Sequence, residues 1–330
     1  MSLPALPSMD ARSWPKAELH CHLDGSVRPD TLASLRAARG LPPAAAPSPG
    51  GGSLEAYLAA FPPVIEALQD AEALERVAAE LAVDARADGV WWLEVRFAPL
   101  LHTRRGLTPR QAIEAVSRGL ARAPLELGAG VIVCALRDHG VDDAWQSFRA
   151  AAALHDAGVV GVDLAGPEAA FPPEPFAEPF AWARGAGLGV TIHAGEAAGP
   201  ASIRAALETC GATRIGHGVT LDADPGLLAA VVEQGVVLEM CPRSNVETGA
   251  VARLSEHPWR RYLARGVRAT LATDNRAVSR TTLTAELTSV EPTLDELTAL
   301  LRHGFEGAFA PPAVRARGAE AVAHRGRHDG

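Results

Sequence analysis

The sequence predicts an α/β protein of the (β/α)8 TIM-barrel class, and three observations lead there. Eight short runs rich in Val, Ile and Leu alternate with longer Ala-, Leu-, Arg- and Glu-rich stretches of helical periodicity. Such alternation implies parallel strands joined by helices, and eight units close a barrel, for which 330 residues suffice. Polar residues also gather at the C-terminal ends of the runs, which share one rim in a barrel. A doubly wound open sheet is the alternative, but it would bring together only the strands beside its switch point.

The first predicted strand carries a pair of histidines. In "AELHCHL", His20 and His22 flank Cys21, so both imidazoles should share one face about 6.6 Å apart, with Cys21 facing away. Two histidines without a role in metal binding would also explain this motif. The residues of the other strands are needed to distinguish that explanation from a metal site. The eight predicted strands cover residues 17–23, 90–97, 131–136, 159–166, 189–195, 213–218, 236–241 and 267–274.

The longest interruption follows the first strand. Residues 40–53, "GLPPAAAPSPGGGS", predict a flexible loop, and residues 54–89 predict helices broken at Pro62 and Pro63. Because this insertion, about residues 42–88, leaves from the rim, it is predicted to form a lid; core packing of an amphipathic helix is the alternative. Four residues of the lid would face the substrate: Leu54, Tyr57, Leu58 and Phe61. At the other end, about residues 312–330 predict a tail, a frayed helix followed by disorder, and we expect one domain over residues 1–330.

Composition and charge exclude several classes of function. The formal net charge of −8 has the wrong sign for an unspecific nucleic-acid binder, so we expect a small-molecule substrate. Neither a signal peptide nor a membrane-spanning run is recognisable, which predicts a soluble, cytoplasmic protein without membrane contact. The four cysteines lack paired spacing and are expected to be reduced thiols: Cys21, Cys134, Cys210 and Cys241.

The polar residues at the strand ends can form a metal site. If they converge, three imidazoles and one carboxylate suit zinc, although iron, manganese or cobalt could bind the same set: His20, His22, His193 and Asp274. A bound metal lowers the pKa of a water from about 16 to about 7 and so supports hydrolysis. Lys16 is the only lysine and lies on the first strand, so a carboxylated lysine from a middle strand cannot bridge two metals. One metal ion per chain is therefore favoured.

Two further residues at the strand ends suit acid–base work. His217, in "RIGHGV", could bind the hydrolytic water, take its proton and stabilise the developing charge. Glu196, in "HAGEAAGP", could as a protonated acid donate to a ring nitrogen. Taken singly, His217 could be a turn residue, and Glu196 could be a charge partner at a helix N-terminus.

Six motifs, in this order, resemble those of adenosine deaminases, particularly the bacterial enzymes. They are "PKAELHCHLDGS", "VDLAGPE", "TIHAGEAAGP", "RIGHGV", "EMCPRSNVETG" and "ATDNRAVSRTTLTAEL", and the resemblance runs from about Trp14 to about Pro312. It implies a zinc-dependent TIM barrel that hydrolyses the 6-amino group of a purine nucleoside to the 6-oxo product and ammonia. The order and spacing of six motifs make this far more specific than a single His-x-His.

The resemblance also implies a role for each site residue. His20, His22, His193 and Asp274 would bind zinc, Glu196 would protonate purine N1, and His217 would handle the water. The backbone N–H of Gly166 would meet N3, and Asp24 would accept the ribose 5′-hydroxyl. Some members of the family have a second Asp where this chain has Asn275, whose amide can donate to N7 without being protonated.

The exact substrate is left open by the sequence. Adenosine or 2′-deoxyadenosine is the leading prediction, because related adenine deaminases have "HLEG" where this chain has "HLDG", and the shorter Asp24 leaves room for a sugar. The alternative is 6-amino-6-deoxyfutalosine, an intermediate of menaquinone synthesis, whose carboxyphenyl group needs an apolar slot and a cation. The candidate cations are Arg28, Arg96 and Arg280, and a structural ion pair is the alternative for each. A catalytically inactive nucleoside-binding barrel is a weaker possibility, and the oligomeric state is not predictable. Most of the other histidines are expected to be solvated: His102, His139, His155, His257, His303, His324 and His328.

Overall fold

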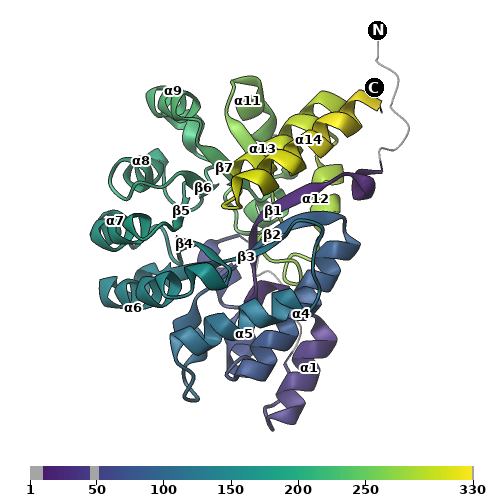
Figure 1. Ribbon diagram of the computed structural model, residues 1–330. Helices are drawn as coiled ribbons and strands as arrows, with labels where there is room; N and C mark the ends of the chain where they lie inside the picture. Colours follow the sequence, from purple (N-terminus) through teal and green to yellow (C-terminus); the bar gives the residue numbers. More distant parts are fainter. Residues whose placement is uncertain (1–9, 45–51, 329–330) are drawn as a thin grey trace.

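The computed structural model describes residues 10–44 and 52–328 and contains one eight-stranded parallel sheet in the order β1 to β8 (Figure 1). The strands are β1 (Lys16–His22), β2 (Val90–Phe97), β3 (Gly128–Leu136), β4 (Val159–Ala165), β5 (Gly189–Ala194), β6 (Arg214–His217), β7 (Val237–Met240) and β8 (Arg268–Leu271). Each lies within or close to one of the eight runs predicted from the sequence. The α/β class is therefore confirmed, with every neighbouring pair parallel.

The sheet closes into a barrel between β1 and the residues that follow β8. The backbone N–H of His22 donates to the carbonyl oxygen of Asp274 at 2.7 Å, and the N–H of Asp274 donates to the carbonyl of His20 at 2.9 Å. Cys21 and Asp274 form a parallel bridge there. Closure confirms the (β/α)8 barrel and makes the open-sheet alternative wrong. Backbone hydrogen bonds thereby join the first sequence motif, which contains His20 and His22, to the last motif, which contains Asp274.

Strand β8 ends at Leu271, short of its predicted range, and Asp274 lies beyond its end. Asp274 has a φ of 59°, in the left-handed region that a non-glycine residue rarely adopts, and His217 at the end of β6 has a φ of 67°. These are two of the four non-glycine residues with positive φ in the described part of the chain. Such conformations persist where the surrounding structure holds them, and they collect at functional sites.

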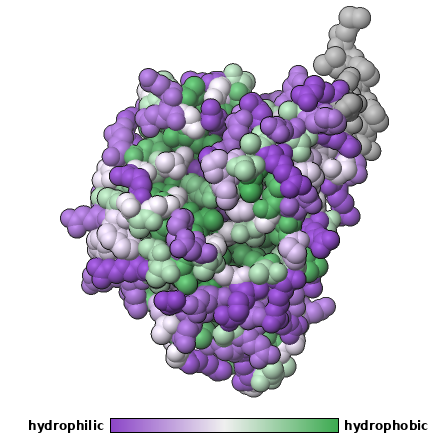
Figure 2. Space-filling view, in the orientation of Figure 1, coloured by the Kyte–Doolittle hydropathy of each residue, from purple (hydrophilic) through white to green (hydrophobic). Residues whose placement is uncertain are grey.

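Helices surround the barrel (Figure 1). They are α1 (Pro29–Ala38), α2 (Leu54–Leu58), α3 (Pro62–Ala67), α4 (Ala71–Ala87), α5 (Pro109–Ala121), α6 (Val141–Ala152), α7 (Ala177–Gly185), α8 (Pro200–Glu208), α9 (Pro225–Gln234), α10 (Pro242–Glu247), α11 (Trp259–Ala264), α12 (Leu283–Ser289), α13 (Leu294–Gly307) and α14 (Pro312–His328). Hydrophilic residues cover much of their outer surface, and hydrophobic residues show mainly in the hollows between them (Figure 2). None of the described helices combines the length and the apolar character needed to cross a bilayer.

The insertion after β1 forms helices α2, α3 and α4, as predicted. Ser53 caps α2 by accepting the N–H of Ala56, and Pro62 opens α3, where a missing N–H costs nothing. The predicted flexible loop falls largely on residues 45–51, which lie outside the described residues. So do residues 1–9, which bear on the signal-peptide prediction. That the whole chain is one domain stays a prediction.

The C-terminal tail differs from its prediction. Residues 312–328 form the continuous helix α14, not a frayed end, because the helix packs on α13. Val322 is fully buried, and Gly318 lies so close to Phe305 that an added Cβ would be 2.1 Å from the ring. Arg325 also donates to the hydroxyl of Ser13 near the other end of the chain. No disorder follows the helix up to residue 328, and residues 329–330 at the end of the predicted tail lie outside the described residues.

Candidate active site

One cavity at the C-terminal ends of the strands collects the residues singled out from the sequence. Eight of the nine line it: His22, Asp24, Gly166, His193, Glu196, His217, Asp274 and Asn275. The ninth, His20, is fully buried, and its ring centroid lies 4.5 Å from that of His193 and 4.9 Å from that of His217. Strand ends far apart in the sequence therefore meet at one place, as a closed barrel requires.

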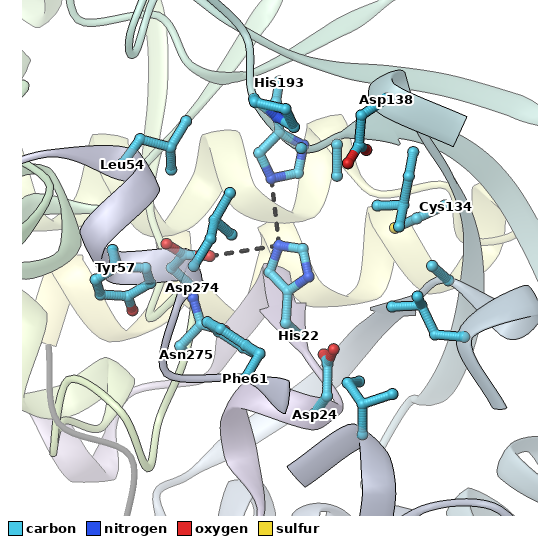
Figure 3. A pocket seen from close by; sticks show the side chains of 18 of the residues that line it. His22, Asp24, Leu54, Tyr57, Phe61, Cys134, Asp138, His193, Asp274 and Asn275 are labelled. Atoms are coloured by element: carbon cyan, nitrogen blue, oxygen red, sulfur yellow. Dashed lines mark hydrogen bonds and ion pairs between the residues drawn. The ribbon is translucent and has the colours of Figure 1, made fainter. Parts of the chain in front are cut away.

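The four predicted metal ligands point their Nε2 and carboxylate atoms at one another, and Figure 3 shows three of them, His22, His193 and Asp274. His22 Nε2 is 3.2 Å from His193 Nε2, and both His20 Nε2 and His22 Nε2 are 3.4 Å from Asp274 Oδ1. His20 Nε2 is buried and has no hydrogen-bond partner among the described residues. A buried, unbonded ring nitrogen facing a carboxylate and other imidazoles fits a metal ligand. The residues present thus suit zinc.

Buried carboxylates lie behind two of these histidines. Glu239 Oε2 is 2.9 Å from His20 Nδ1, and Asp163 Oδ2 is 3.0 Å from His193 Nδ1. Arg96 bridges both carboxylates, at 2.9 Å from Asp163 and 2.6 Å from Glu239. A carboxylate on Nδ1 turns Nε2 toward the site and makes the imidazole a better ligand. The sequence analysis missed Asp163 and Glu239, and it considered Arg96 only as a partner for a substrate carboxylate. Charged residues inside the apolar runs "VWWLEVRF", "VVGVDLAG" and "VVLEMC" are a signal for all three.

Burial and neighbouring charges tune the ligands. Burial lowers the pKa of His20 to about 4 and holds the pKa of His22 well below its usual range, so both rings are neutral at pH 7. Burial acts in the same direction on His193, but the Asp163 carboxylate outweighs it and raises the pKa of that ring. Burial opposes the ionised form of Asp274, yet His20 and His22 lower its pKa well below the ordinary value. The neutral rings of His20 and His22 and the ionised Asp274 are thus in the protonation states that bind a metal, whereas His193 would release its proton more readily on binding one.

His217 lies close enough to belong to the same cluster. The potential ligand atoms of His20, His193, His217 and Asp274 all lie within 4.8 Å of one another. Two sets of four potential metal ligands are therefore possible. Both contain His20, His193 and Asp274, and the fourth ligand is either His22 or His217. The two rings differ in their partners, because His217 Nδ1 is 2.9 Å from the side-chain amide of Asn245 and its Nε2 is 3.5 Å from Glu196 Oε2.

Glu196 is a buried acid with one oxygen already bonded. Thr248 Oγ1 donates to Glu196 Oε1 at 3.0 Å, and the amide of Asn245 lies 3.4 Å from the same oxygen. Oε2 faces His217. Burial raises the pKa of Glu196, although His217 acts in the opposite sense. Burial thus shifts Glu196 toward its neutral form, in which the carboxyl group can donate a proton.

The loop that carries Glu196 is held by a second buried carboxylate, which the sequence analysis also missed. Glu168, in "VDLAGPE", accepts four successive backbone N–H groups, at distances from 2.5 to 3.1 Å: those of Gly195, Glu196, Ala197 and Ala198. A carboxylate that accepts several N–H groups fixes the path of a loop. Its position after a strand end was the available signal.

The predicted substrate-binding residues lie on the cavity beside this cluster. Asp24 Oδ1 and Asn275 Oδ1 are buried and have no hydrogen-bond partner among the described residues. Burial raises the pKa of Asp24 to about 6. A Cβ on Gly25 would lie 1.7 Å from Asn275 Oδ1, so glycine is required for this approach. Gly166 has a φ of 101° and also lines the cavity.

The lid residues also reach the cavity. Leu54, Tyr57, Leu58 and Phe61 all line it, as the lid interpretation predicts, and Figure 3 shows three of them beside Asp274 and Asn275. Tyr57 is buried, and its hydroxyl lies 3.0 Å from Ser279 Oγ, which in turn donates to Glu247 at 2.5 Å. Side chains of the insertion are thus attached to the loop after β8.

The structure does not support the three arginines that the sequence suggested as partners for a substrate carboxylate. Arg96 is fully buried behind the histidines, and Arg28 is paired with Asp84. Neither these two nor Arg280 is among the described residues that line the cavity. Arg104, which the sequence analysis did not consider, does line it and is exposed.

The structure also bears on the expectations for the cysteines, for Lys16 and for the remaining histidines. The four cysteines are free, as predicted, and buried. Lys16 lies at the start of β1, away from the cavity, where its ammonium donates to the carbonyls of Ala11, Arg12 and Trp14. His139, His155 and His324 are exposed, but the expectation of solvation is wrong for three buried histidines: His102, His257 and His303. The side chain of His328 is outside the described part.

A (β/α)8 barrel with a histidine and aspartate cluster at the C-terminal ends of its strands defines a metal-dependent hydrolase. The family model described as adenosine deaminase matches residues 15–325. An adenosine deaminase of Clostridium perfringens is 39% identical over 305 residues, covering 87% of this chain and 90% of that protein. This chain belongs to the adenosine deaminase family and is a deaminase enzyme.

Solved structures agree with this assignment. An adenine deaminase from Arthrobacter aurescens superposes with a TM-score of 0.89 at 26% identity and covers 95% of this chain, with 99% of its own chain covered. An amidohydrolase from Burkholderia ambifaria with bound Zn has a TM-score of 0.87 at 24% identity, covering 100% of this chain and 95% of its own, and this likeness concerns the fold. Deamination is thus established at the level of the family, and the substrate is not.

Proposed function

We propose that this enzyme hydrolyses the 6-amino group of adenosine and 2′-deoxyadenosine, giving the 6-oxo nucleoside and ammonia. The observation that carries the proposal is the convergence, in one cavity, of three histidines and Asp274 with the buried acid Glu196. Asp24 adds a buried carboxylate oxygen with no partner among the described residues, which suits a sugar hydroxyl as donor. The small cavity between the strand ends favours a small-molecule purine.

One zinc ion per chain would be held by His20, His22, His193 and Asp274. When bound, zinc supplies a Lewis acid that lowers the pKa of a water to about 7. Asp163 and Glu239 hold two of the rings in place from behind. The chain's own task is therefore to keep three imidazole Nε2 atoms and one carboxylate aimed at a single point.

The purine is oriented and activated by side chains around that point. Glu196, as the neutral acid, donates from Oε2 to N1, which makes C6 more electrophilic. The water that adds at C6 first loses one proton to solvent, and His217 hydrogen-bonds the anionic oxygen as it bonds to C6. The second proton of that water passes to the 6-amino group, which leaves as ammonia, and Glu196 is reprotonated from solvent. Asn275 presents an amide to N7, the N–H of Gly166 meets N3, and Asp24 accepts the 5′-hydroxyl.

A second substrate, 6-amino-6-deoxyfutalosine, is favoured by one specific observation. Arg104 lines the same cavity as the apolar lid residues Leu58 and Phe61 and as Leu101, which follows β2. A cavity lined by both apolar side chains and an exposed cation suits a carboxyphenyl group. Under this alternative the chemistry at C6 is unchanged, and the lid and Arg104 become the determinants of specificity.

Steady-state deamination of adenosine, 2′-deoxyadenosine, adenine and aminodeoxyfutalosine separates the two substrates. We expect adenosine to reach a kcat/KM above about 10⁴ M⁻¹s⁻¹, within the usual range of enzymes. Turnover of aminodeoxyfutalosine alone would overturn the proposal and establish the second substrate. In that case Arg104→Ala should raise KM, whereas Arg105→Ala, at an exposed neighbour outside the cavity lining, should not.

Replacing Glu196 tests the mechanism independently of the substrate. Glu196→Gln keeps the size of the side chain but removes the proton that it would give to N1. We expect kcat to fall by about 10² to 10⁴ with zinc content unchanged. Retained activity in this variant would contradict proton donation by Glu196.

A further inference from the structure

A chain of buried hydrogen bonds runs from His217 through Asn245 and His257 to Trp259. The backbone N–H of Trp259 fixes which atom donates and which accepts in each bond. The backbone N–H of Trp259 lies 3.4 Å from His257 Nδ1 and can only donate. His257 Nδ1 is therefore an acceptor, and the proton of the neutral ring sits on Nε2. Burial lowers the pKa of His257 to about 3, which keeps this ring neutral.

The same reasoning assigns the donor and the acceptor in the hydrogen bonds from His257 to Asn245 and from Asn245 to His217. His257 Nε2 is 3.1 Å from Asn245 Oδ1, so the carbonyl oxygen of Asn245 accepts and its amide group is turned the other way. Asn245 Nδ2 lies 2.9 Å from His217 Nδ1, and an amide nitrogen can only donate. His217 Nδ1 is thus an acceptor, which leaves the ring proton on Nε2, the nitrogen that faces Glu196.

We propose that His257, acting through Asn245, holds His217 in the tautomer that presents an N–H to the cavity. This inference rests on the proposed role of His217 in the deamination. It sharpens that role, because His217 with Nε2–H donates to the oxygen that adds at C6 and does not begin as a base at that atom. His257 and Asn245 are positioning residues, since they act through His217.

Because the chain of hydrogen bonds is buried, it determines the tautomer of His217. Asn245 is 0% exposed, His217 1% and His257 5%, so solvent cannot replace a lost partner without rearrangement. Asn245 also belongs to α10, where its backbone N–H donates to Cys241 and its carbonyl accepts from Val251. The same amide lies 3.4 Å from Glu196 Oε1, so Asn245 contacts both proposed acid–base residues.

The test is the tautomer of His217 itself, read from the ¹⁵N shifts of its ring in long-range ¹H–¹⁵N spectra of the zinc-loaded protein. Assignment uses His217→Gln. We expect Nε2–H in the unmodified enzyme and in His257→Gln, whose amide can still donate to Asn245. Asn245→Asp reverses the final bond, because a carboxylate accepts from Nδ1–H, and should move the proton to Nδ1. His257→Leu should leave a mixture of both forms.

Kinetics on adenosine give a second readout. Asn245→Asp should lower kcat by about 10²-fold or more with a much smaller change in KM, and His257→Gln should restore most of what His257→Leu loses. His303→Gln is the matched control, because His303 is also buried and hydrogen-bonded, to the carbonyl of Ala269, but lies behind β8. It should change neither the shifts of His217 nor kcat.

Three results would overturn the proposal: an Nδ1–H signal for His217 in the unmodified enzyme, a metal-ligand shift at its Nε2, or unchanged His217 shifts in both Asn245→Asp and His257→Leu. The NMR result does not depend on which nucleoside is turned over. It therefore stands even if adenosine is not the substrate, and failure of the two proposals can be told apart. If His257→Leu does not fold, Asn245→Asp and His257→Gln carry the test.

Discussion

The floor of the cavity and its lid are built in different ways. We use "floor" for His20, His22, His193 and Asp274, and "lid" for helices α2 and α3. Backbone hydrogen bonds across the barrel closure join three residues of the floor, and buried carboxylates hold two of its rings. The lid contributes mainly apolar side chains and is attached through Tyr57 to Ser279. From this difference we expect the barrel to fix the chemistry and the insertion to adjust which substrate is admitted.

The largest effect is expected from removing the carboxylate of the floor. Asp274→Ala should abolish zinc binding and lower kcat/KM by at least about 10³-fold, since Asp274 contacts both histidines of β1. Metal analysis and steady-state rates measure the two effects. Asp142→Ala, at an exposed site on α6, is the control. Full zinc occupancy with normal activity in Asp274→Ala would show that the floor is not the metal site.

The next effect separates support of the floor from general stability. Asp163→Asn should weaken zinc affinity by about 10- to 100-fold, because it removes the charge behind His193. Glu94→Gln is matched, since Glu94 is also a fully buried carboxylate, paired with Arg214 at 2.6 Å. Both variants should lower the free energy of unfolding, by about 3–5 kcal/mol where a buried pair is broken. Equal zinc affinities for the two would argue against a specific role of Asp163.

A smaller effect is expected where the Glu196 loop is anchored. Glu168→Gln exchanges one of the accepting oxygens for an amide group that faces backbone N–H groups. We expect kcat to fall by up to about 10²-fold, because displacing a catalytic group by a fraction of an ångström has that cost, while zinc stays bound. The exposed Glu174→Gln provides the comparison. A normal kcat would mean that other contacts suffice to hold Glu196.

The smallest effect belongs to the lid. Tyr57→Phe removes the hydrogen bond to Ser279, worth about 0.5–1.5 kcal/mol, and keeps the apolar ring on the cavity. KM should therefore rise by up to about tenfold at nearly constant kcat. Substrate titrations with wild type and variant measure both constants. A selective loss of kcat would place Tyr57 with the floor and weaken the distinction between the two regions.

Much of the floor was predictable from the sequence, and its support was not. His20, His22, His193 and Asp274 stand out because polar residues end apolar strands, and parallel strands in a barrel share one rim. Asp163 and Glu239 lie inside strands, where nothing local shows which charge they meet. Their partner Arg96 lies on β2, 143 residues from Glu239 in the sequence. Helix α14 was mispredicted for a similar reason, since its order depends on packing against α13.

The sequence by itself determined the periodicity of eight strands, the kinds of residue at their ends and the resemblance that places the enzyme among deaminases. Local patterning suffices for these, because alternating burial and turn signals act over a few residues. The tertiary structure alone decided which ring nitrogen faces the cavity, how Asn245 and His257 are directed toward His217, and which arginine reaches the lining. Such features depend on the register at which distant strands meet and on hydrogen bonds that form only after the barrel closes.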